Sequence, residues 1–347
     1  MRRLRAVMKG LLTWDRTGRF VTTAFQRILR RTPSREEHAH WVKVTVAVGP
    51  AEVLDLLFAS GEYSHRSRVD DLSEFYAGHY YSPVVDPEAL RASGFTVDRS
   101  PDTAVLPGIA LDADAMLAFW DRNLAGMQAA GIVADETPPL RYYAVNDVYA
   151  WGDAYVLNAM IAELAPRRIL EIGSGFSSAC MLDAVDRLGL ATTFTFVEPY
   201  AERLQSRLSD RDRARCTIIE TPVQQIGREL YEALEPSDIL FIDSTHVSKA
   251  GSDVNFELFE MLPALKPGVI VHFHDTFFPF EYPEAWIFEA RRSWNELYIL
   301  RAFLTGNPAW EIVFFNDYFA RRHPQAAAAL PGFQANPGGG LWLRKRG

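Results

Sequence analysis

The sequence RILEIGSGFSS at residues 168–178 predicts the fold more directly than any other part of the chain. It begins as an apolar run typical of a buried strand, reaches an acid at Glu171, and breaks at Gly173 and Gly175. The run SACMLDAV at residues 178–185 then has the pattern of a helix. Glycines at a strand-to-helix turn allow positive φ and let a ligand approach the backbone closely. We therefore expect a ligand-binding turn at the carboxyl end of this strand.

The charge of Glu171 distinguishes between two kinds of ligand. A carboxylate beside the turn repels a pyrophosphate and attracts an ammonium group. A nicotinamide-binding fold with Glu198 on the ribose is the alternative, but Ser178 stands where its fingerprint has a third glycine. The stretch resembles the first motif of class I S-adenosylmethionine-dependent methyltransferases, whose cofactor carries an ammonium and a sulfonium group.

Residues 141–347 alternate strand-like runs with helical segments, which is the pattern of a parallel sheet with crossover helices. We predict strands at residues 168–172, 193–197, 216–220, 238–242, 268–273, 311–315 and 341–344. Five parallel strands and a C-terminal antiparallel hairpin resemble the methyltransferase sheet, whereas a dinucleotide-binding fold ends on another parallel strand. The predicted fold is therefore α/β, a seven-stranded Rossmann-like methyltransferase sheet preceded by a small all-α domain.

The region before this domain has a different composition. Ten of the first 35 residues are Lys or Arg and one, Asp15, is acidic. Apolar residues at helical spacing follow, and Ser34 with Glu37 has the pattern of a capping box. We predict a basic arm, a helical docking or oligomerisation module, a Pro/Asp-rich connector or lid, and the methyltransferase domain, at residues 1–17, 18–82, 83–140 and 141–347.

The helical module resembles a known family in three places. These are FQRILRRTP at residues 25–33, Trp41, and LLFASGEY at residues 56–63. Together they resemble a helical module of unknown function that is related to phycobilisome linkers. The module has no catalytic set of residues, so the resemblance implies docking or self-association.

Composition excludes several classes of protein. The net charge of −8 argues against general nucleic-acid binding, which needs a basic surface. Two cysteines, Cys180 and Cys216, are predicted to be small core residues of a reducing compartment. No apolar run approaches the ~20 residues of a membrane span, and the N-terminus lacks a cleavage-site pattern. We expect a cytoplasmic protein. Contact between the basic arm and an anionic membrane surface is kept as an alternative role for that arm.

Cofactor-binding residues are expected just beyond the strands, because ligands of open parallel sheets bind at the carboxyl ends. Glu198 follows the second predicted strand, and the resemblance implies that its carboxylate accepts hydrogen bonds from both ribose hydroxyls. The adenine is expected beside Gln224 or Gln225. The implied cofactor is S-adenosyl-L-methionine, held by Glu171, Ile172, Gly173, Ser174, Gly175, Glu198, Pro199, Gln224 and Asp243.

Catalytic residues are expected at the ends of the fourth and fifth strands. These strands deliver IDSTH at residues 242–246 and VHFHDT at residues 271–276, and the two ends are neighbours in such a sheet. IDSTH resembles the aspartate-to-histidine motif of a methyltransferase branch that acts on small molecules, including sugars. We predict a catalytic set of His246, His274 and Asp275, with His246 as the general base and His274 as its rival.

A divalent cation is the alternative occupant of this edge of the sheet. Carboxylates and imidazoles suit such an ion. Some related sugar and catechol methyltransferases hold magnesium at these two strand ends, usually with two consecutive carboxylate or amide oxygens. This chain has His274 followed by Asp275, so we assign no metal ligands and keep magnesium as the alternative.

The predicted reaction is O-methylation of a hydroxyl on a small molecule or glycan. Aromatic residues at 277–286 and 291–296 suit stacking on a sugar or ring, although ordinary packing explains them nearly as well. The segment at residues 142–153 resembles one that lines the cofactor or acceptor pocket in this branch. N-methylation of a small amine, and a ligand-binding scaffold without activity, are the alternatives.

Overall fold

The computed structural model describes residues 16–29, 31–61, 75, 77–104 and 106–347. The chain divides into two compact units, residues 1–89 and 90–347. Each unit has an apolar core of its own. Residues 90–140, predicted as part of a connector, therefore cluster with the sheet of the second unit. Of the basic arm predicted at residues 1–17, residues 1–15 lie outside the described part of the chain.

The first unit contains short helices that pack around Phe25, Val42, Val53 and Leu57. Its elements are the π-helical turn η1 (Phe25–Leu29), α2 (Arg35–Val48) and α3 (Pro50–Phe58). The capping box predicted for Ser34 and Glu37 is present at the start of α2. Helix α5 (Pro87–Ala92) spans the division between the two units.

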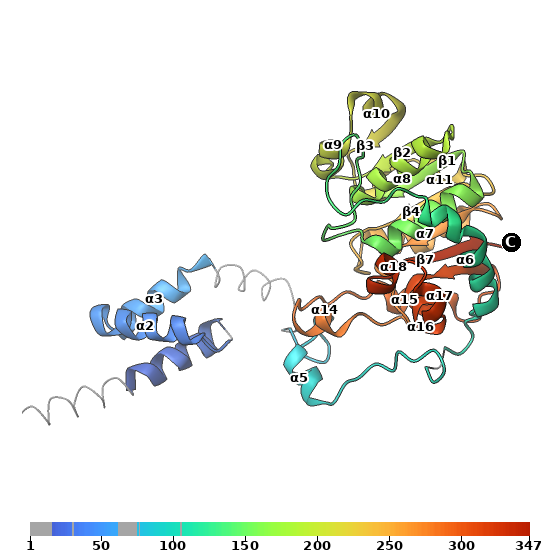
Figure 1. Ribbon diagram of the computed structural model, residues 1–347. Helices are drawn as coiled ribbons and strands as arrows, with labels where there is room; N and C mark the ends of the chain where they lie inside the picture. The colour runs from blue at the N-terminus through green and yellow to red at the C-terminus, as the bar shows by residue number, and fades with distance from the viewer. Residues whose placement is uncertain (1–15, 30, 62–74, 76, 105) are drawn as a thin grey trace, which may run out of the picture. The chain divides into compact units, whose positions relative to one another are not determined.

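The second unit is built on a seven-stranded sheet (Figure 1). Its strands are β1 (Arg168–Ile172), β2 (Thr193–Val197), β3 (Cys216–Ile219), β4 (Ile239–Ile242), β5 (Ile270–Phe273), β6 (Trp310–Phe315) and β7 (Leu341–Lys345). The order is β3-β2-β1-β4-β5-β7-β6, the first five strands are parallel, and β7 is antiparallel to β5 and β6. The predicted strands and the terminal hairpin are thus confirmed.

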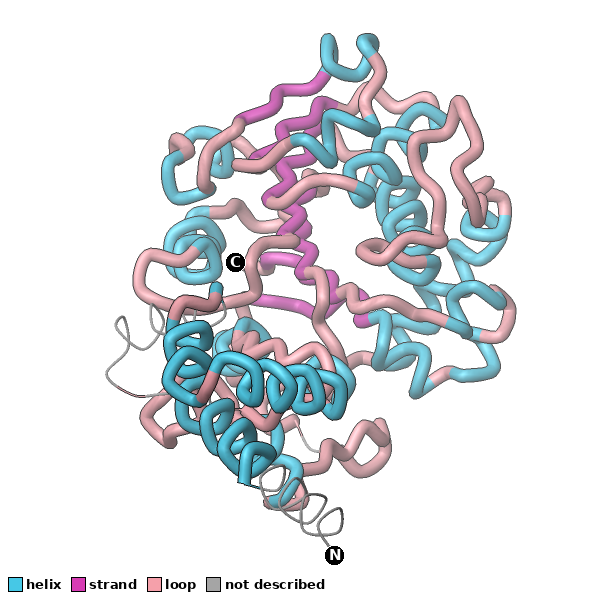
Figure 2. Tube along the Cα trace, turned by 90° about the vertical axis from the view of Figure 1, so that its left-hand side faces the viewer, coloured by secondary structure: helices cyan, strands magenta, loops and turns pink. Residues whose placement is uncertain are grey.

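Helices cover both sides of this twisted sheet (Figure 2). Before the sheet come α6 (Ala113–Gln128) and α7 (Trp151–Leu164). Between the parallel strands lie α8 (Phe176–Leu188), α9 (Glu202–Arg207), α10 (Asp210–Arg215), η2 (Val223–Gln225), α11 (Glu229–Glu232), α12 (Asp253–Phe256), η3 (Glu257–Met261) and α13 (Leu262–Ala264). The remaining helices are α14 (Glu284–Phe288), α15 (Glu296–Leu304), α16 (Asn316–Arg322), α17 (Pro324–Ala327) and α18 (Pro331–Ala335).

The segment before the sheet is part of the folded core. Met116, Phe119 and Trp120 of α6 are buried in the same apolar cluster as the strands. The Arg99 guanidinium donates hydrogen bonds to the carbonyls of Phe278, Glu281 and Tyr282. Helix α6 is therefore packed against the sheet, and Arg99 is bonded to the loop that follows β5.

The cysteines and the absence of a membrane span were also predicted from the sequence. Cys180 and Cys216 are free thiols, and Cys180 is buried, as expected of small core residues. Within the described ranges, no helix is long and apolar enough to cross a membrane.

Candidate active site

The turn after β1 needs a glycine at position 173. Gly173 has φ +76°, a region that other residues rarely adopt. A Cβ atom built there would lie 1.8 Å from the carbonyl oxygen of Asp243. The backbone of β4 therefore passes directly against the glycine turn, and the ends of β1 and β4 form one continuous edge.

Glu198, at the end of β2, is held by two backbone amides. Its Oε2 accepts a hydrogen bond from the Ser174 N–H at 3.1 Å, and its Oε1 accepts one from the Tyr200 N–H at 2.8 Å. Each carboxylate oxygen has a second lone pair, so the group can accept further hydrogen bonds from a ligand. The glycine turn and the end of β2 are thus joined through this side chain.

A cavity of about 370 Å³ opens between these loops. It is lined by six of the nine residues predicted to bind cofactor: Ile172, Gly173, Glu198, Pro199, Gln224 and Asp243. The Gln224 amide donates a hydrogen bond to the Gly251 carbonyl. Ser174 and Gly175 do not line the cavity, although the buried Ser174 hydroxyl has no hydrogen-bond partner within the described part of the chain.

Glu171 also lies away from the cavity. It is fully buried, and the hydroxyls of Ser177 and Ser178 donate hydrogen bonds of 2.5 Å to its two carboxyl oxygens. Burial raises the pKa of Glu171 to about 8, against the effect of the two hydroxyl hydrogen bonds. In this structure the Glu171 carboxyl group ties β1 to the first turn of α8.

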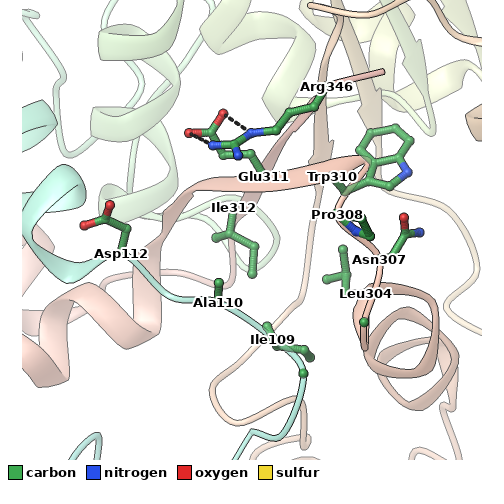
Figure 3. A pocket seen from close by; sticks show the side chains of 12 residues that line it. Ile109, Ala110, Asp112, Leu304, Asn307, Pro308, Trp310, Glu311, Ile312 and Arg346 are labelled. Carbon is green, nitrogen blue, oxygen red and sulfur yellow. Dashed lines mark hydrogen bonds and ion pairs between the residues drawn. The ribbon is translucent and has the colours of Figure 1, made fainter.

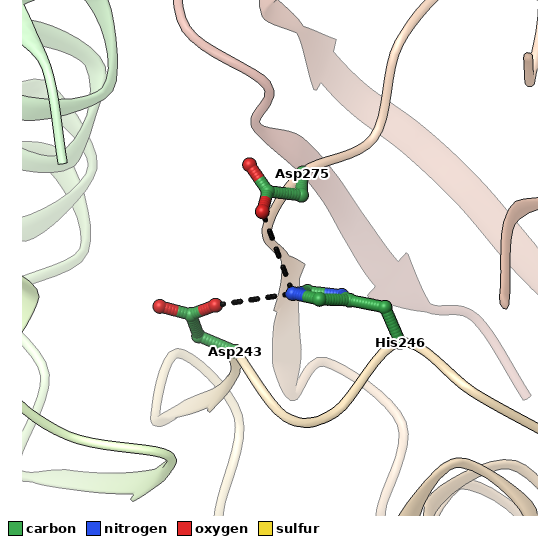
Figure 4. Close-up of side chains that lie close together, drawn as sticks. All are labelled: Asp243, His246 and Asp275. Carbon is green, nitrogen blue, oxygen red and sulfur yellow. Dashed lines mark ion pairs between the residues drawn. The ribbon is translucent and has the colours of Figure 1, made fainter. Parts of the chain in front are cut away.

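His246 lies at the centre of a cluster of acids (Figure 4). Its Nε2 is 3.6 Å from Oδ1 of Asp243 and 3.4 Å from Oδ2 of Asp275. Its Nδ1 is 2.8 Å from Oε2 of Glu296. Because Asp243 also lines the 370 Å³ cavity, the imidazole and the cavity share one wall.

Charge around His246 stabilises its protonated form. Burial lowers the pKa of this imidazole, but the hydrogen bond with Glu296 and the charges of Asp275 and Asp243 outweigh it, so the pKa is raised. The pKa of Asp243 is also raised, chiefly by burial. The Trp294 ring lies 4.4 Å from the imidazole, centroid to centroid, and covers it.

His274 lies deeper than His246. Its Nε2 is 3.2 Å from the Val148 carbonyl oxygen and 3.5 Å from Oδ1 of Asp275. Burial lowers the pKa of His274, but the charges of Asp243, Asp275 and Asp153 raise it to about 9. Burial in turn raises the pKa of Asp153 to about 7.

His272 is not part of this cluster. It is buried inside β5, with its ring 4.0 Å from that of Phe241 and 4.4 Å from that of Trp342, centroid to centroid. Burial lowers the pKa of His272 well below the ordinary value, so the ring is neutral. His272 is therefore a core residue of β5.

Sequence reasoning missed the partners of these histidines. Glu296 begins α15, and Asp153 lies in the first turn of α7. The pattern WNELYILRAFL at residues 294–304 indicates the start of a helix, but no local signal places its first carboxylate against His246. Much of the predicted aromatic loop is simply packed, since Phe278, Phe280 and Tyr282 are buried.

The geometry of a cation site is also present. One oxygen each of Asp243 and Asp275 and one ring nitrogen of His246 lie within 4.8 Å of one another. Nε2 of the imidazole lies between the two carboxylates, and the raised pKa of His246 favours binding of a proton by the ring. A cation there would have to compete with that proton.

A larger cavity, of about 520 Å³, lies beside β6 (Figure 3). It shares no lining residue with the cavity at Glu198. Its charged groups have partners in the protein: Glu311 pairs with Arg346 at 3.2 Å, and Asp112 caps α6. Nothing in its lining resembles the predicted cofactor site.

The chain matches a known protein family in the region that contains the glycine turn, Glu198 and the ends of β4 and β5. Residues 170–276 match the family described as "Methyltransferase domain". This match, the sheet with its reversed β7, and the glycine turn joined to Glu198 define a class I S-adenosylmethionine-dependent methyltransferase. Residues 170–276 therefore form a methyltransferase domain, and S-adenosylmethionine is its cofactor.

The individual proteins that this chain resembles share little sequence identity with it. An uncharacterised protein of Archaeoglobus fulgidus is 30% identical over 176 residues, which are 48% of this chain and 76% of the relative. The S-adenosylhomocysteine-bound Podospora anserina methyltransferase PaMTH1 is 16% identical, with 78% of this chain and 100% of that chain covered and a TM-score of 0.36. The O-methyltransferase TomG from Streptomyces achromogenes, solved with S-adenosylmethionine, is 15% identical, with 69% and 92% covered and a TM-score of 0.35.

Proposed function

We propose that this methyltransferase transfers the methyl group of S-adenosylmethionine to a hydroxyl of a small molecule or glycan, with His246 as the general base. The observation that carries the proposal is the position of Asp243. This residue lines the cavity of the glycine turn and Glu198, and it also lies 3.6 Å from Nε2 of His246. A methyl donor in the cavity would therefore lie next to a group that can accept a proton.

The cavity has the features that the cofactor requires. In the proposal, Glu198 accepts hydrogen bonds from the ribose hydroxyls, since its two oxygens keep free lone pairs. Ile172, Pro199 and Gln224 supply the cavity walls. When bound, S-adenosylmethionine supplies an electrophilic methyl group on sulfur.

The base is needed because a hydroxyl is a weak nucleophile. As the new C–O bond forms and the C–S bond breaks, the hydroxyl proton must move to an acceptor. Nε2 of His246 faces the shared wall, whereas Nε2 of His274 is held by the Val148 carbonyl. We therefore assign the proton to His246, and we assign His274 and Asp275 the role of setting the charge around it.

The acidic character of the cluster favours one alternative acceptor, a small amine. Asp243, Asp275 and Glu296 surround His246, and such a group of carboxylates attracts a cation. An amine loses its proton more readily than a hydroxyl, so N-methylation depends less on His246. The role of the base therefore distinguishes the two acceptors.

The residues that line the 370 Å³ cavity and those of the His246 cluster all belong to the second unit. We propose that it serves docking or self-association, as its resemblance to linker-related modules implies. A protein that binds the cofactor without turning it over would use this unit as its functional part. This scaffold hypothesis predicts cofactor binding without a methylated product.

One experiment tests the proposal directly. Purified chain is incubated with S-adenosylmethionine and a panel of sugars, nucleotide sugars, phenols and small amines, and products are screened by mass spectrometry for the gain of one methyl group. Methylation of a hydroxyl compound that persists with a chelator supports the proposal. Methylation of amines alone, or activity abolished by the chelator, would replace it with N-methylation or with metal-assisted transfer.

A further inference from the structure

Glu296 makes the shortest contact that His246 has. Its Oε2 lies 2.8 Å from Nδ1 of the imidazole, and both side chains are buried. A carboxylate accepts hydrogen bonds and an imidazole N–H donates them, so the proton of this pair lies on Nδ1. The other ring nitrogen, Nε2, then faces Asp243 and Asp275.

The same segment also holds the backbone of His246. The N–H groups of Asn295 and Glu296 both donate to the His246 carbonyl oxygen, at 3.1 and 3.2 Å. The Asn295 side chain bonds to the N–H and the carbonyl of Ser248, at 2.6 and 3.2 Å. His246 has φ +60°, a left-handed conformation that a non-glycine residue keeps only where its surroundings enforce it.

We propose that Glu296 is a positioning residue, which fixes His246 in the tautomer that carries its proton on Nδ1 and leaves Nε2 to accept the proton of the methyl acceptor. This inference rests on the proposed function. When Nε2 takes the proton, the imidazole becomes a cation whose new charge lies 2.8 Å from the Glu296 carboxylate. The proton then leaves from Nε2 to solvent, and the pair returns to its starting state.

Four side chains that contact the imidazole have a place in this arrangement. Glu296 faces Nδ1, Asp243 and Asp275 face Nε2, and Trp294 covers the ring. A second buried acid, Glu257, lies nearby but accepts its hydrogen bond from the Ser244 hydroxyl, at 3.0 Å, and not from His246. Glu257 is therefore the matched control for a change at Glu296.

The tautomer is measurable without any acceptor. Nitrogen-15 NMR of histidine-labelled, cofactor-free protein, at a pH where the His246 ring is neutral, reports which ring nitrogen carries the proton. We expect the wild type to show protonated Nδ1 and unprotonated Nε2. Glu296→Gln, which keeps the size and removes the charge, should shift the population toward protonated Nε2, while Glu257→Gln should leave the His246 signals unchanged.

Three results would overturn the inference. One is a wild-type ring with its proton on Nε2, which needs no variant to observe. Another is a Glu296→Gln spectrum identical to that of the wild type. The third is an equal change in Glu257→Gln, which would make the effect a general one of buried acids.

Turnover supplies the second measurement. With any acceptor found by the screen, Glu296→Gln should lower kcat by about tenfold to a hundredfold and leave the Kd for S-adenosylmethionine unchanged. Glu296→Asp, which retains the charge, should recover part of the loss. If the NMR result holds but no hydroxyl compound is methylated, the proposed function fails and the tautomer assignment stands. An unaltered kcat in Glu296→Gln removes the positioning role.

Discussion

The two sides of this site are built by different means. On the cofactor side, backbone amides of neighbouring loops hold a single half-buried carboxylate, that of Glu198. On the proposed acceptor side, side chains hold one another: Glu296 and Asp275 contact His246, and Asp275 also contacts His274. The proposed cofactor side is thus held by backbone hydrogen bonds, whereas the proposed acceptor side consists of ionisable side chains in contact with one another.

The largest expected effect lies on the acceptor side. His246→Ala removes the proposed proton acceptor and should lower kcat with a hydroxyl substrate by about 10²–10⁴-fold. The Kd for S-adenosylmethionine should stay close to the wild-type value, because the imidazole does not line the 370 Å³ cavity. Steady-state kinetics and calorimetric titration measure the two quantities. A His246→Ala enzyme with full activity on a hydroxyl acceptor would remove the general base from the mechanism.

The pH dependence of turnover should report the charge around His246. Its pKa is raised, so the cationic form, which cannot accept a proton, persists to higher pH than in an ordinary histidine. The rate should therefore rise with pH, about tenfold per unit below the pKa, through an apparent pKa above ~6.5. Initial rates between about pH 5 and 9 measure this limb. A midpoint below 6.5, or the same limb in His246→Ala, would assign the titration to another group.

On the cofactor side the expected effect is smaller and appears in binding. Glu198→Ala leaves the ribose hydroxyls without their acceptor, which costs about 1–3 kcal/mol. The Kd for S-adenosylmethionine should rise by about tenfold or more, while kcat at saturation changes little. Glu220→Ala is the control, because Glu220 is an exposed acid beyond β3 that does not line the cavity. Equal affinities for wild type and Glu198→Ala would mean that another residue binds the ribose.

The difference between the two sides also explains what the sequence could predict. The cofactor side follows from short motifs at strand ends, because the parallel sheet aligns those ends: six predicted residues line one cavity. The same rule brought His246 and Asp275 together across β4 and β5. The rule does not predict the positions of Glu296 and Asp153, because these residues lie on helices. Tertiary packing brings those helices to the site, and no local sequence pattern encodes that packing. In the same way, the apolar face of α6 does not reveal in the sequence that it packs against the strands.

Glu171 is the residue on which the motif and the structure suggest different roles. The motif predicts contact with the cofactor ammonium, whereas the structure buries the carboxyl group between two serine hydroxyls. If the main role of Glu171 is to tie β1 to α8, Glu171→Gln should change the Kd for S-adenosylmethionine by less than about twofold. A tenfold loss of affinity in this variant, which keeps the size of the side chain, would restore the ammonium contact.

The same variant should alter stability in a pH-dependent way. The folded-state pKa of Glu171, about 8, lies above the ordinary value of 4.5. Its contribution to the free energy of unfolding is therefore complete below the ordinary value and is lost as the pH rises through the folded-state value. Glutamine does not ionise, so the Tm of Glu171→Gln relative to wild type should increase between about pH 5 and pH 8, as thermal unfolding would record. A constant difference in Tm across this range would mean that Glu171 is already ionised in the folded protein, as a residue that binds the cofactor ammonium would be.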